Sequence, residues 1–538
     1  MFKQSIITAY LMISLAGLYA QEDHTYAFVL NPEGDAGLKP ATAYKFEVVG
    51  KVYKDLLQAR GDARQQAPEL TMNDGARFVA WMDPKKVRIG MEEKAYDVCV
   101  RFGADSLAAM AALLAHELTH YFEKHDWSRN FAHGHSELST AKAIGLMDEG
   151  LKQETQADYM GGVLAFSAGY NVYGIMPRLL PQIYQSYGLP ETLPGYPSLT
   201  ERVAVSQNAM SQLLDLQTVF ETARYLSILE NYESAAQYHR HILQHFQSRE
   251  IYNNAGVNLA LAALPYFGPA EMPYILPLET DAYSRLHSLK NVQSDRLEIR
   301  KALLDEALQQ FDRAILLDPK YAPAYLHKAC VYAVNSEWDE AEFWLKKGRR
   351  HADAAKAAGF EALEGILLAM QGDTAKAEAA LGTAHRRGNV LAGLNLDILQ
   401  GVPRVPPRDV TTPSIERIDN FVIDDFLRSP AVEKEIKVSR QVICGKKKLA
   451  QSALWLHYEN DGQQYAVIHW CDGTGKNQTG KGIGKGAVSA AVMEAYGTPQ
   501  RVLPDQGGTL WAYPGLGLLF SISPQGQVAG WGTYRKSK

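Results

Sequence analysis

Residues 113–120 read Leu-Leu-Ala-His-Glu-Leu-Thr-His, an H-E-x-x-H motif at the end of the apolar run 108–114. The run predicts a buried helix. Side chains four positions apart share a helix face, so His116 and His120 can bind one metal ion with Glu117 beside them. Zinc is often held by such an imidazole pair, and a zinc-bound water needs a carboxylate to take its proton. The alternative is a helix that carries two histidines near its polar end by chance.

A second acidic pattern supplies a candidate third ligand. Glu154 lies 34 residues beyond His120, and Asp158 follows one helical turn later. A catalytic zinc site uses three protein ligands and keeps one position for water. Asp158 could accept the free ring N–H of a metal-bound histidine and so orient it. The same carboxylates would also suit the first turns of an ordinary helix, where negative charge is favoured.

A third motif is Pro197-Ser198-x-x-Glu201-Arg202. Ser198 and Glu201 have the spacing of a capping box, which predicts a helix N-terminus. The capping box leaves Arg202 unexplained, so we expect Arg202 to face the metal site.

These motifs, taken in order with Ala168-Gly169-Tyr170, resemble the HtpX-like and BepA-like zinc metallopeptidases. That family also contains the CAAX prenyl endopeptidase. The resemblance covers roughly residues 40–210. It implies a gluzincin-like, mainly α domain with a small β-sheet, in which one Zn²⁺ per chain is bound by His116, His120 and Glu154.

The resemblance also implies roles for the residues around the metal. Glu117 would be the general base, Asp158 would orient a ligand, and Arg202 would bind substrate or stabilise the oxyanion. Many members carry a histidine before the Pro-Ser pair that can contact the metal and hold the enzyme inactive, whereas this chain has Tyr196. Two roles are open for Tyr196: a hydrogen bond to the tetrahedral intermediate, or simple packing. The candidate catalytic residues are thus Glu117, Arg202 and Tyr196.

Two segments upstream of the motif predict strands, residues 76–81 and 86–91. In zinc peptidases of this kind, an edge strand beside the catalytic helix pairs with an extended substrate, which gives affinity with modest sequence specificity. Either segment could be that edge strand.

The chain as a whole has 538 residues, so several domains are expected. Its net charge of −5 argues against nucleic-acid binding. Residues 1–20 combine Lys3 with an apolar run, which predicts a signal peptide cleaved after Ala20; an uncleaved anchor is the alternative. No cysteine follows the cleavage site and no second apolar run of membrane-spanning length occurs, so we expect a periplasmic or secreted mature protein without a lipid anchor or a transmembrane segment.

Small and apolar residues recur with a 34-residue period between residues 213 and 402. One set is Ala307, Phe311 and Ala314, the next is Ala341, Leu345 and Gly348, and a further unit holds Gly365, Ala377, Leu381 and Ala384. The pattern resembles tetratricopeptide repeats, which form a helical solenoid with a concave surface. The resemblance implies a protein partner or substrate on that surface; the alternative is a solenoid that only packs against the rest of the chain. Residues 264–302 contain four closely spaced prolines and predict a loop-rich insertion.

The last part, residues 415–538, predicts a small α+β domain. Segments 453–458 and 465–470 flank an Asp-Gly turn and predict a hairpin, followed by a helix over 487–495 and strands over 509–511 and 517–522. Residues 475–482 nearly spell a P-loop, but Gly482 replaces the Ser/Thr that would hold magnesium, so we expect no nucleotide. Cys444 and Cys471 lie in this domain, where a disulfide between them is possible in an oxidising compartment. Cys99 and Cys330 are expected to be buried thiols.

The sequence therefore predicts four parts: a signal peptide (1–20), a zinc metallopeptidase domain (21–212), a tetratricopeptide-repeat region (213–402) and an α+β domain (415–538). The predicted function is that of a zinc-dependent endopeptidase whose repeats recruit substrate or partner proteins, with envelope protein quality control implied by the BepA-like resemblance. The alternative is a repeat-based scaffold or chaperone whose peptidase domain is a minor or inactive component.

Overall fold

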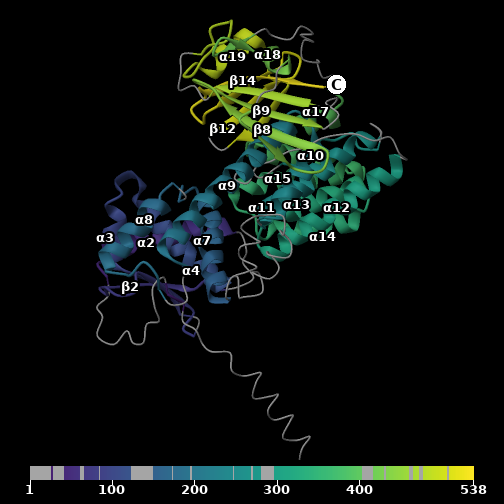
Figure 1. Cartoon of the computed structure of the whole chain (residues 1–538). Coiled ribbons are helices and arrows are strands. Elements are labelled where there is room, and N and C mark those ends of the chain that lie inside the picture. Colours follow the sequence, from purple (N-terminus) through teal and green to yellow (C-terminus); the bar gives the residue numbers. More distant parts are fainter. Residues whose placement is uncertain are drawn as a thin grey trace, which may run out of the picture. The chain divides into compact units, whose positions relative to one another are not determined.

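The computed structural model describes residues 26–27, 41–60, 66–83, 85–122, 149–172, 174–193, 197–245, 247–267, 271–279, 296–402, 416–428, 432–459, 465–471, 477–505 and 508–537 (Figure 1). The predicted signal peptide and Tyr196 lie outside this set. Contacts divide the chain into two compact units, residues 1–60 with 65–212 and residues 61–64 with 213–538. Among the helices in these ranges, none has both the length and the apolar composition that a membrane span requires.

The first unit combines helices with a small sheet. Its helices are α2 (Ala43–Arg60), α3 (Glu93–Val100), η1 (Gly103–Asp105), α4 (Ser106–Phe122), α7 (Glu149–Ser167), α8 (Met176–Tyr187) and the start of α9 (Leu199–Ile228). The predicted helix around the H-E-x-x-H motif is confirmed as α4, whose residues 109–119 are all buried. An apolar helix that is buried on every side needs neighbours all round, and α4 packs against α7, α2, α3 and the sheet.

The small sheet has the strand order β1–β3–β4–β2, with β1 at Tyr26–Ala27, β3 at Ala80–Asp83, β4 at Arg88–Glu92 and β2 at Glu69–Asn73. β4 is interior, since it pairs parallel with β2 and antiparallel with β3. β3 contacts α4, and within the described part of the chain its outer side pairs only with the two residues of β1. Of the two predicted strands, the one at 76–81 corresponds to β3. This strand lies nearer the edge of the sheet than β4 and contacts α4, the helix that carries the H-E-x-x-H motif.

The predicted strand 76–81 begins later than expected, at Ala80. The buried carboxylate of Glu92 accepts hydrogen bonds from the backbone N–H groups of Arg77 (2.9 Å), Phe78 (3.0 Å) and Val79 (3.3 Å). Val79 also has a left-handed φ of 64°, which ends the turn. The segment wraps around a carboxylate 13–15 positions away instead of pairing with a strand, and no local pattern signals this.

The second unit begins with pairs of helices. They are the rest of α9 with α10 (Tyr232–Leu243), α11 (Arg249–Ala263) with α12 (Arg296–Leu317), α13 (Ala322–Val334) with α14 (Trp338–Arg349), α15 (Ala354–Met370) with α16 (Thr374–Arg386), and finally α17 (Val390–Leu399). Small residues lie where the paired helices cross: a Cβ on Gly348 would stand 2.3 Å from Tyr325 Cβ, and one on Gly365 would stand 2.6 Å from Leu381 Cγ. The predicted insertion 264–302 ends earlier than expected, because α12 already starts at Arg296.

The remainder of this unit is an eight-stranded antiparallel sheet in the order β11–β12–β13–β14–β10–β9–β8–β7. Its strands are β7 (Lys434–Lys437), β8 (Val442–Lys448), β9 (Ala453–Glu459), β10 (Tyr465–Cys471), β11 (Arg501–Asp505), β12 (Gly508–Tyr513), β13 (Leu518–Ile522) and β14 (Val528–Lys536). A two-stranded pair, β5 (Arg417–Ile418) with β6 (Phe421–Val422), and two helices, α18 (Ile423–Arg428) and α19 (Ser489–Tyr496), complete it. The predicted hairpin is confirmed as β9–β10, with Tyr458 opposite Tyr465.

One face of this sheet shares a hydrophobic core with α9 and α10, which includes Tyr225, Tyr238 and Trp455. The helix pairs and the sheet thus belong to one compact unit, although the sequence suggested two separate domains. All four cysteines are buried, and none of them is in a disulfide. Cys444 lies in the core shared with the helices and Cys471 in a different cluster with Trp531, so the possible disulfide is not formed.

Three buried histidines in this unit predict that acid weakens it. Burial lowers the pKa of His327 and His457 to about 3 and that of His469 to about 4. In the unfolded chain these imidazoles titrate near about 6.5. Below that pH the unfolded chain therefore binds protons that the folded chain cannot, so stability is complete above about pH 6.5 and is lost as the pH falls.

Tyr238 Oη lies 2.8 Å from His457 Nδ1. The variant His457→Gln keeps a polar partner for this hydroxyl, but the glutamine side chain cannot take up a proton. Thermal melts at pH 7.5 and pH 5 should show a smaller acid destabilisation in the variant, by on the order of 1–2 kcal/mol at pH 5. An unchanged difference between the two pH values would contradict this assignment.

Candidate metal centre

The candidate centre forms where α4 crosses α7. His116 and His120 lie one turn apart on α4, and Glu154 lies on α7. Their ligand atoms all fall within 4.8 Å of one another, and His116 and Glu154 are buried. The structure therefore brings together the three residues predicted as metal ligands, in a group that could hold a metal ion.

The distances within this group fit a tetrahedral ion. His116 Nε2 lies 3.1 Å from His120 Nε2 and 3.3 Å from Glu154 Oε2, and His120 Nε2 lies 3.4 Å from Glu154 Oε1. Ligand atoms about 2.0–2.1 Å from a tetrahedral zinc ion are separated by about 3.3–3.4 Å. The two short distances to Glu154 involve its two different oxygens, and the group could hold a metal ion. Two imidazole ligands suit a transition metal better than magnesium or calcium, which prefer oxygen ligands.

Asp158 stands behind the first ligand, as the sequence predicted. The Nδ1–H group of His116 donates to Asp158 Oδ1 at 2.9 Å, which leaves Nε2 on the side of the other ligands. Burial disfavours charge on His116, but the hydrogen bond to Asp158 prevails and raises the pKa of His116 to about 10. A metal ion must therefore displace a proton from Nε2, so its binding should weaken in acid.

Arg202 pairs with the same aspartate. Its Nε donates to Asp158 Oδ2 at 2.8 Å and its Nη2 to Asp158 Oδ1 at 2.7 Å, and both side chains are buried. Burial opposes ionisation of Asp158, but the charge of Arg202 prevails and holds the pKa of Asp158 well below its usual range. The sequence suggested a substrate or oxyanion contact for Arg202. The contact seen here orients Asp158, which in turn orients His116.

Glu117 faces this group from α4 and is fully buried. Neither of its carboxylate oxygens has a hydrogen-bond partner among the described residues. Burial raises the pKa of Glu117 to about 8. A buried carboxylate without a hydrogen-bond partner is costly unless a water, ion or ligand approaches it, and Glu117 has this property beside the three candidate metal ligands.

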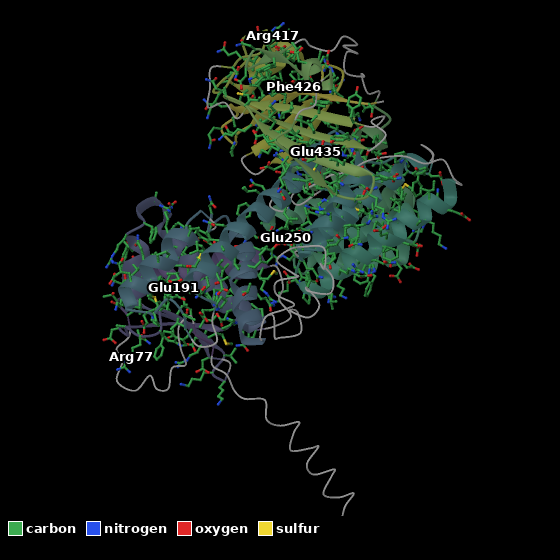
Figure 2. The ribbon with its side chains drawn as sticks, viewed as in Figure 1. Arg77, Glu191, Glu250, Arg417, Phe426 and Glu435 are labelled. Carbon is green, nitrogen blue, oxygen red and sulfur yellow. The ribbon has the colours of Figure 1, made fainter. Side chains whose placement is uncertain are left out.

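The start of α9, which carries Arg202, is held by two carboxylates. The predicted capping box is confirmed: the Ser198 N–H donates to Glu201 Oε2 at 2.8 Å, and the Glu201 N–H donates to Ser198 Oγ at 3.2 Å. Glu191, labelled in Figure 2, accepts hydrogen bonds from the N–H (3.0 Å) and the hydroxyl (2.8 Å) of Thr200. The sequence analysis did not find Glu191, which precedes the helix and carries no motif of its own.

The sequence analysis also missed Gly161, which sets the spacing of the two helices. A Cβ at this position would lie 2.8 Å from the backbone nitrogen of His116 and 2.9 Å from the carbonyl of Ala115. The α7 backbone therefore touches the α4 backbone at the first ligand. A glycine inside a helical pattern was the available signal, because it costs helix stability unless close packing requires it.

Gly161→Ala should therefore disturb the centre. The added methyl group must push α7 from α4, and we expect zinc affinity to fall about 10–100-fold, as for loss of a supporting contact around a metal. Competition with a chromogenic chelator measures this. Gly50→Ala on α2 is the matched control, because its Cβ would have no neighbour closer than 4.0 Å. Equal zinc affinity in both variants would contradict the proposed role of Gly161.

Comparison with protein-family models found no match for this chain, and comparison with curated proteins found no similar one. The functional interpretation of the centre therefore depends on its residues and their geometry.

Proposed function

We propose that this protein is a zinc-dependent endopeptidase of the type seen in the HtpX-like and BepA-like family. The observation that carries the proposal is the pairing of a metal-ligand group, His116, His120 and Glu154, with the buried carboxylate of Glu117 that has no hydrogen-bond partner among the described residues. A structural zinc site would use four protein ligands, whereas three ligands beside a candidate base are typical of a hydrolytic site.

The chemistry divides among the residues as follows. When bound, zinc would polarise the substrate carbonyl and, as a nearby positive charge, lower the pKa of a bound water and of Glu117. Glu117 takes the proton of the attacking water and passes it to the leaving amine. Asp158 holds His116 with Nε2 toward the other ligands, and Arg202 keeps Asp158 ionised and in place. Tyr196 remains a candidate for contact with the tetrahedral intermediate.

Substrate is proposed to bind as an extended strand on the outer side of β3, in place of the two residues of β1 that pair there. β3 contacts α4, and its outer side already pairs antiparallel with Tyr26 and Ala27. Pairing through backbone groups gives affinity with little sequence preference, so unfolded or extended protein segments are the proposed substrate class. If the predicted signal peptide directs it to the envelope or outside the cell, the protein would act on envelope or secreted proteins and recruit them or their partners through the tetratricopeptide-like helix pairs.

Metal content tests the centre directly. The purified wild-type chain should contain about one zinc per molecule, and His116→Ala should contain less than about a tenth of that. His385→Ala, which removes an exposed histidine from the second unit, is the matched control and should keep the metal. Full zinc occupancy in His116→Ala would show that the metal lies elsewhere. Cleavage of casein that resists a chelator would show that the peptidase activity does not need the metal.

A further inference from the structure

The connection between α11 and α12 is much longer than the helix pairing requires. α13 joins α14 through residues 335–337, and α15 joins α16 through residues 371–373, so three residues suffice for the same turn. Between η2 (Leu264–Tyr266) and α12, however, the chain runs from residue 267 to residue 295. Connections of this length are uncommon inside a compact region and are usually either functional or linker segments.

Part of this connection, residues 271–279, forms neither helix nor strand and is hydrogen-bonded to α13 and α17. These first helices, α11, α13, α15 and α17, contact one another in sequence and form one face of the array. Leu276 and Leu278 are buried in the same cluster as Leu326 of α13, Ile366 of α15 and Ala392 of α17. The apolar side chains of the segment thus belong to the hydrophobic core that the helix pairs build.

The main chain of the segment is bound by polar side chains of those helices. Asn395 of α17 is fully buried; its Oδ1 accepts the Ile275 N–H at 2.8 Å and its Nδ2 donates to the Ile275 carbonyl at 2.8 Å. His327 of α13 accepts the Glu279 N–H on Nε2 at 3.3 Å.

The orientation of His327 is set from a third helix. Its Nδ1 lies 2.8 Å from Asn253 Oδ1 of α11, and Asn253 is itself fully buried. Because Nε2 acts as the acceptor, Nδ1 is the donor to Asn253. Buried Asn and His side chains are costly in an apolar core unless they have a partner. Here the partner is the main chain of 271–279, so the helices recognise the backbone of a peptide and the position of its aliphatic side chains.

From this arrangement we propose that the shared face of α11, α13, α15 and α17 is a peptide-binding surface and that residues 271–279 are its internal ligand. The external ligand is a protein segment of the same chemistry: without regular secondary structure, containing proline and aliphatic residues, and uncharged between its ends. Such a segment binds by displacing 271–279. A tethered ligand has an effective concentration in the millimolar range, so the wild-type chain should bind external peptides weakly until the internal segment is displaced.

The test uses a fluorescent peptide with the sequence of residues 271–279 and measures anisotropy with the full chain. Every protein carries Glu117→Gln, so that cleavage cannot consume the peptide. Leu276→Asp with Leu278→Asp places charges on the buried side chains of the internal segment and should tighten peptide binding at least about tenfold. Adding Asn395→Ala to this double variant should weaken its peptide binding again, by at least about tenfold. Leu316→Asp introduces the same charge at an exposed position of α12, outside this segment, and should leave the weak binding unchanged.

Two results would overturn the proposal. The first is that a Leu276→Asp, Leu278→Asp chain that still melts cooperatively binds the peptide no more tightly than wild type. The second is that the tighter binding remains after Asn395→Ala is added. If the double variant does not fold, hydrogen exchange on the chain with its own segment intact decides. Excess peptide should accelerate amide exchange in residues 271–279 while exchange in α13 and α15 stays constant. Unchanged exchange in 271–279 at millimolar peptide would show that the segment is only a structural loop.

Discussion

Glu117→Gln should reduce the cleavage of casein by on the order of 10³-fold while leaving one zinc bound per chain. Glutamine has nearly the same shape as glutamate, so the packing of α4 is kept, but an amide cannot accept the proton of the attacking water. The side chain has no hydrogen-bond partner among the described residues, so the substitution breaks no protein contact seen there. A loss of activity without loss of metal would therefore report the chemical step.

The matched control is Glu47→Gln, which neutralises an exposed glutamate on α2 of the same unit and should cleave at the wild-type rate. Wild-type cleavage by Glu117→Gln would refute the proposed mechanism. If the wild-type chain binds unfolded casein but neither chain cleaves it, the scaffold or chaperone alternative becomes the better explanation.

Arg202→Met should destabilise the first unit by about 3–5 kcal/mol, the usual cost of leaving one charge of a buried pair without its partner. Asp158 is buried, and two of the hydrogen bonds to its carboxylate come from Arg202. Arg202→Lys should rescue little, because an ammonium group cannot make the two-pronged contact of a guanidinium. Urea unfolding of each variant measures the effect.

The double variant Arg202→Met, Asp158→Asn separates stability from metal binding. With both charges removed, most of the lost stability should return. Zinc affinity should nevertheless remain about 10–100-fold below wild type, because His116 no longer has the carboxylate that orients it. If the double variant regained full zinc affinity, Asp158 and Arg202 would have only a structural role.

Features that depend on neighbouring residues could be predicted from the sequence. The H-E-x-x-H face of α4, the capping box at Ser198 and Glu201, and the β9–β10 hairpin all follow from the fixed periods of helices and strands or from turn chemistry. Small residues at the helix crossings of the repeats were also visible, because Ala307, Phe311 and Ala314 are followed 34 residues later by Ala341, Leu345 and Gly348.

Features that depend on distant partners could not be predicted in the same way. Residues 76–79 have the composition of a strand but turn around the carboxylate of Glu92. Strands β7, β8, β11 and β14 show no clear alternation by themselves, and they join the sheet because a partner strand satisfies their backbone. The binding of residues 271–279 by Asn395 spans 120 positions, a distance over which no local pattern operates.

The sequence by itself determined that His116 and His120 lie on one face of a helix with Glu117 next to them, because an α-helix has 3.6 residues per turn. It named Glu154, Asp158 and Arg202 as candidates without placing them. The tertiary structure decided that Glu154 meets both histidines and that Arg202 binds Asp158. The physical reason is that contacts between helices depend on how closely the helices pack, and here the absence of a side chain at Gly161 lets α7 reach the backbone of His116.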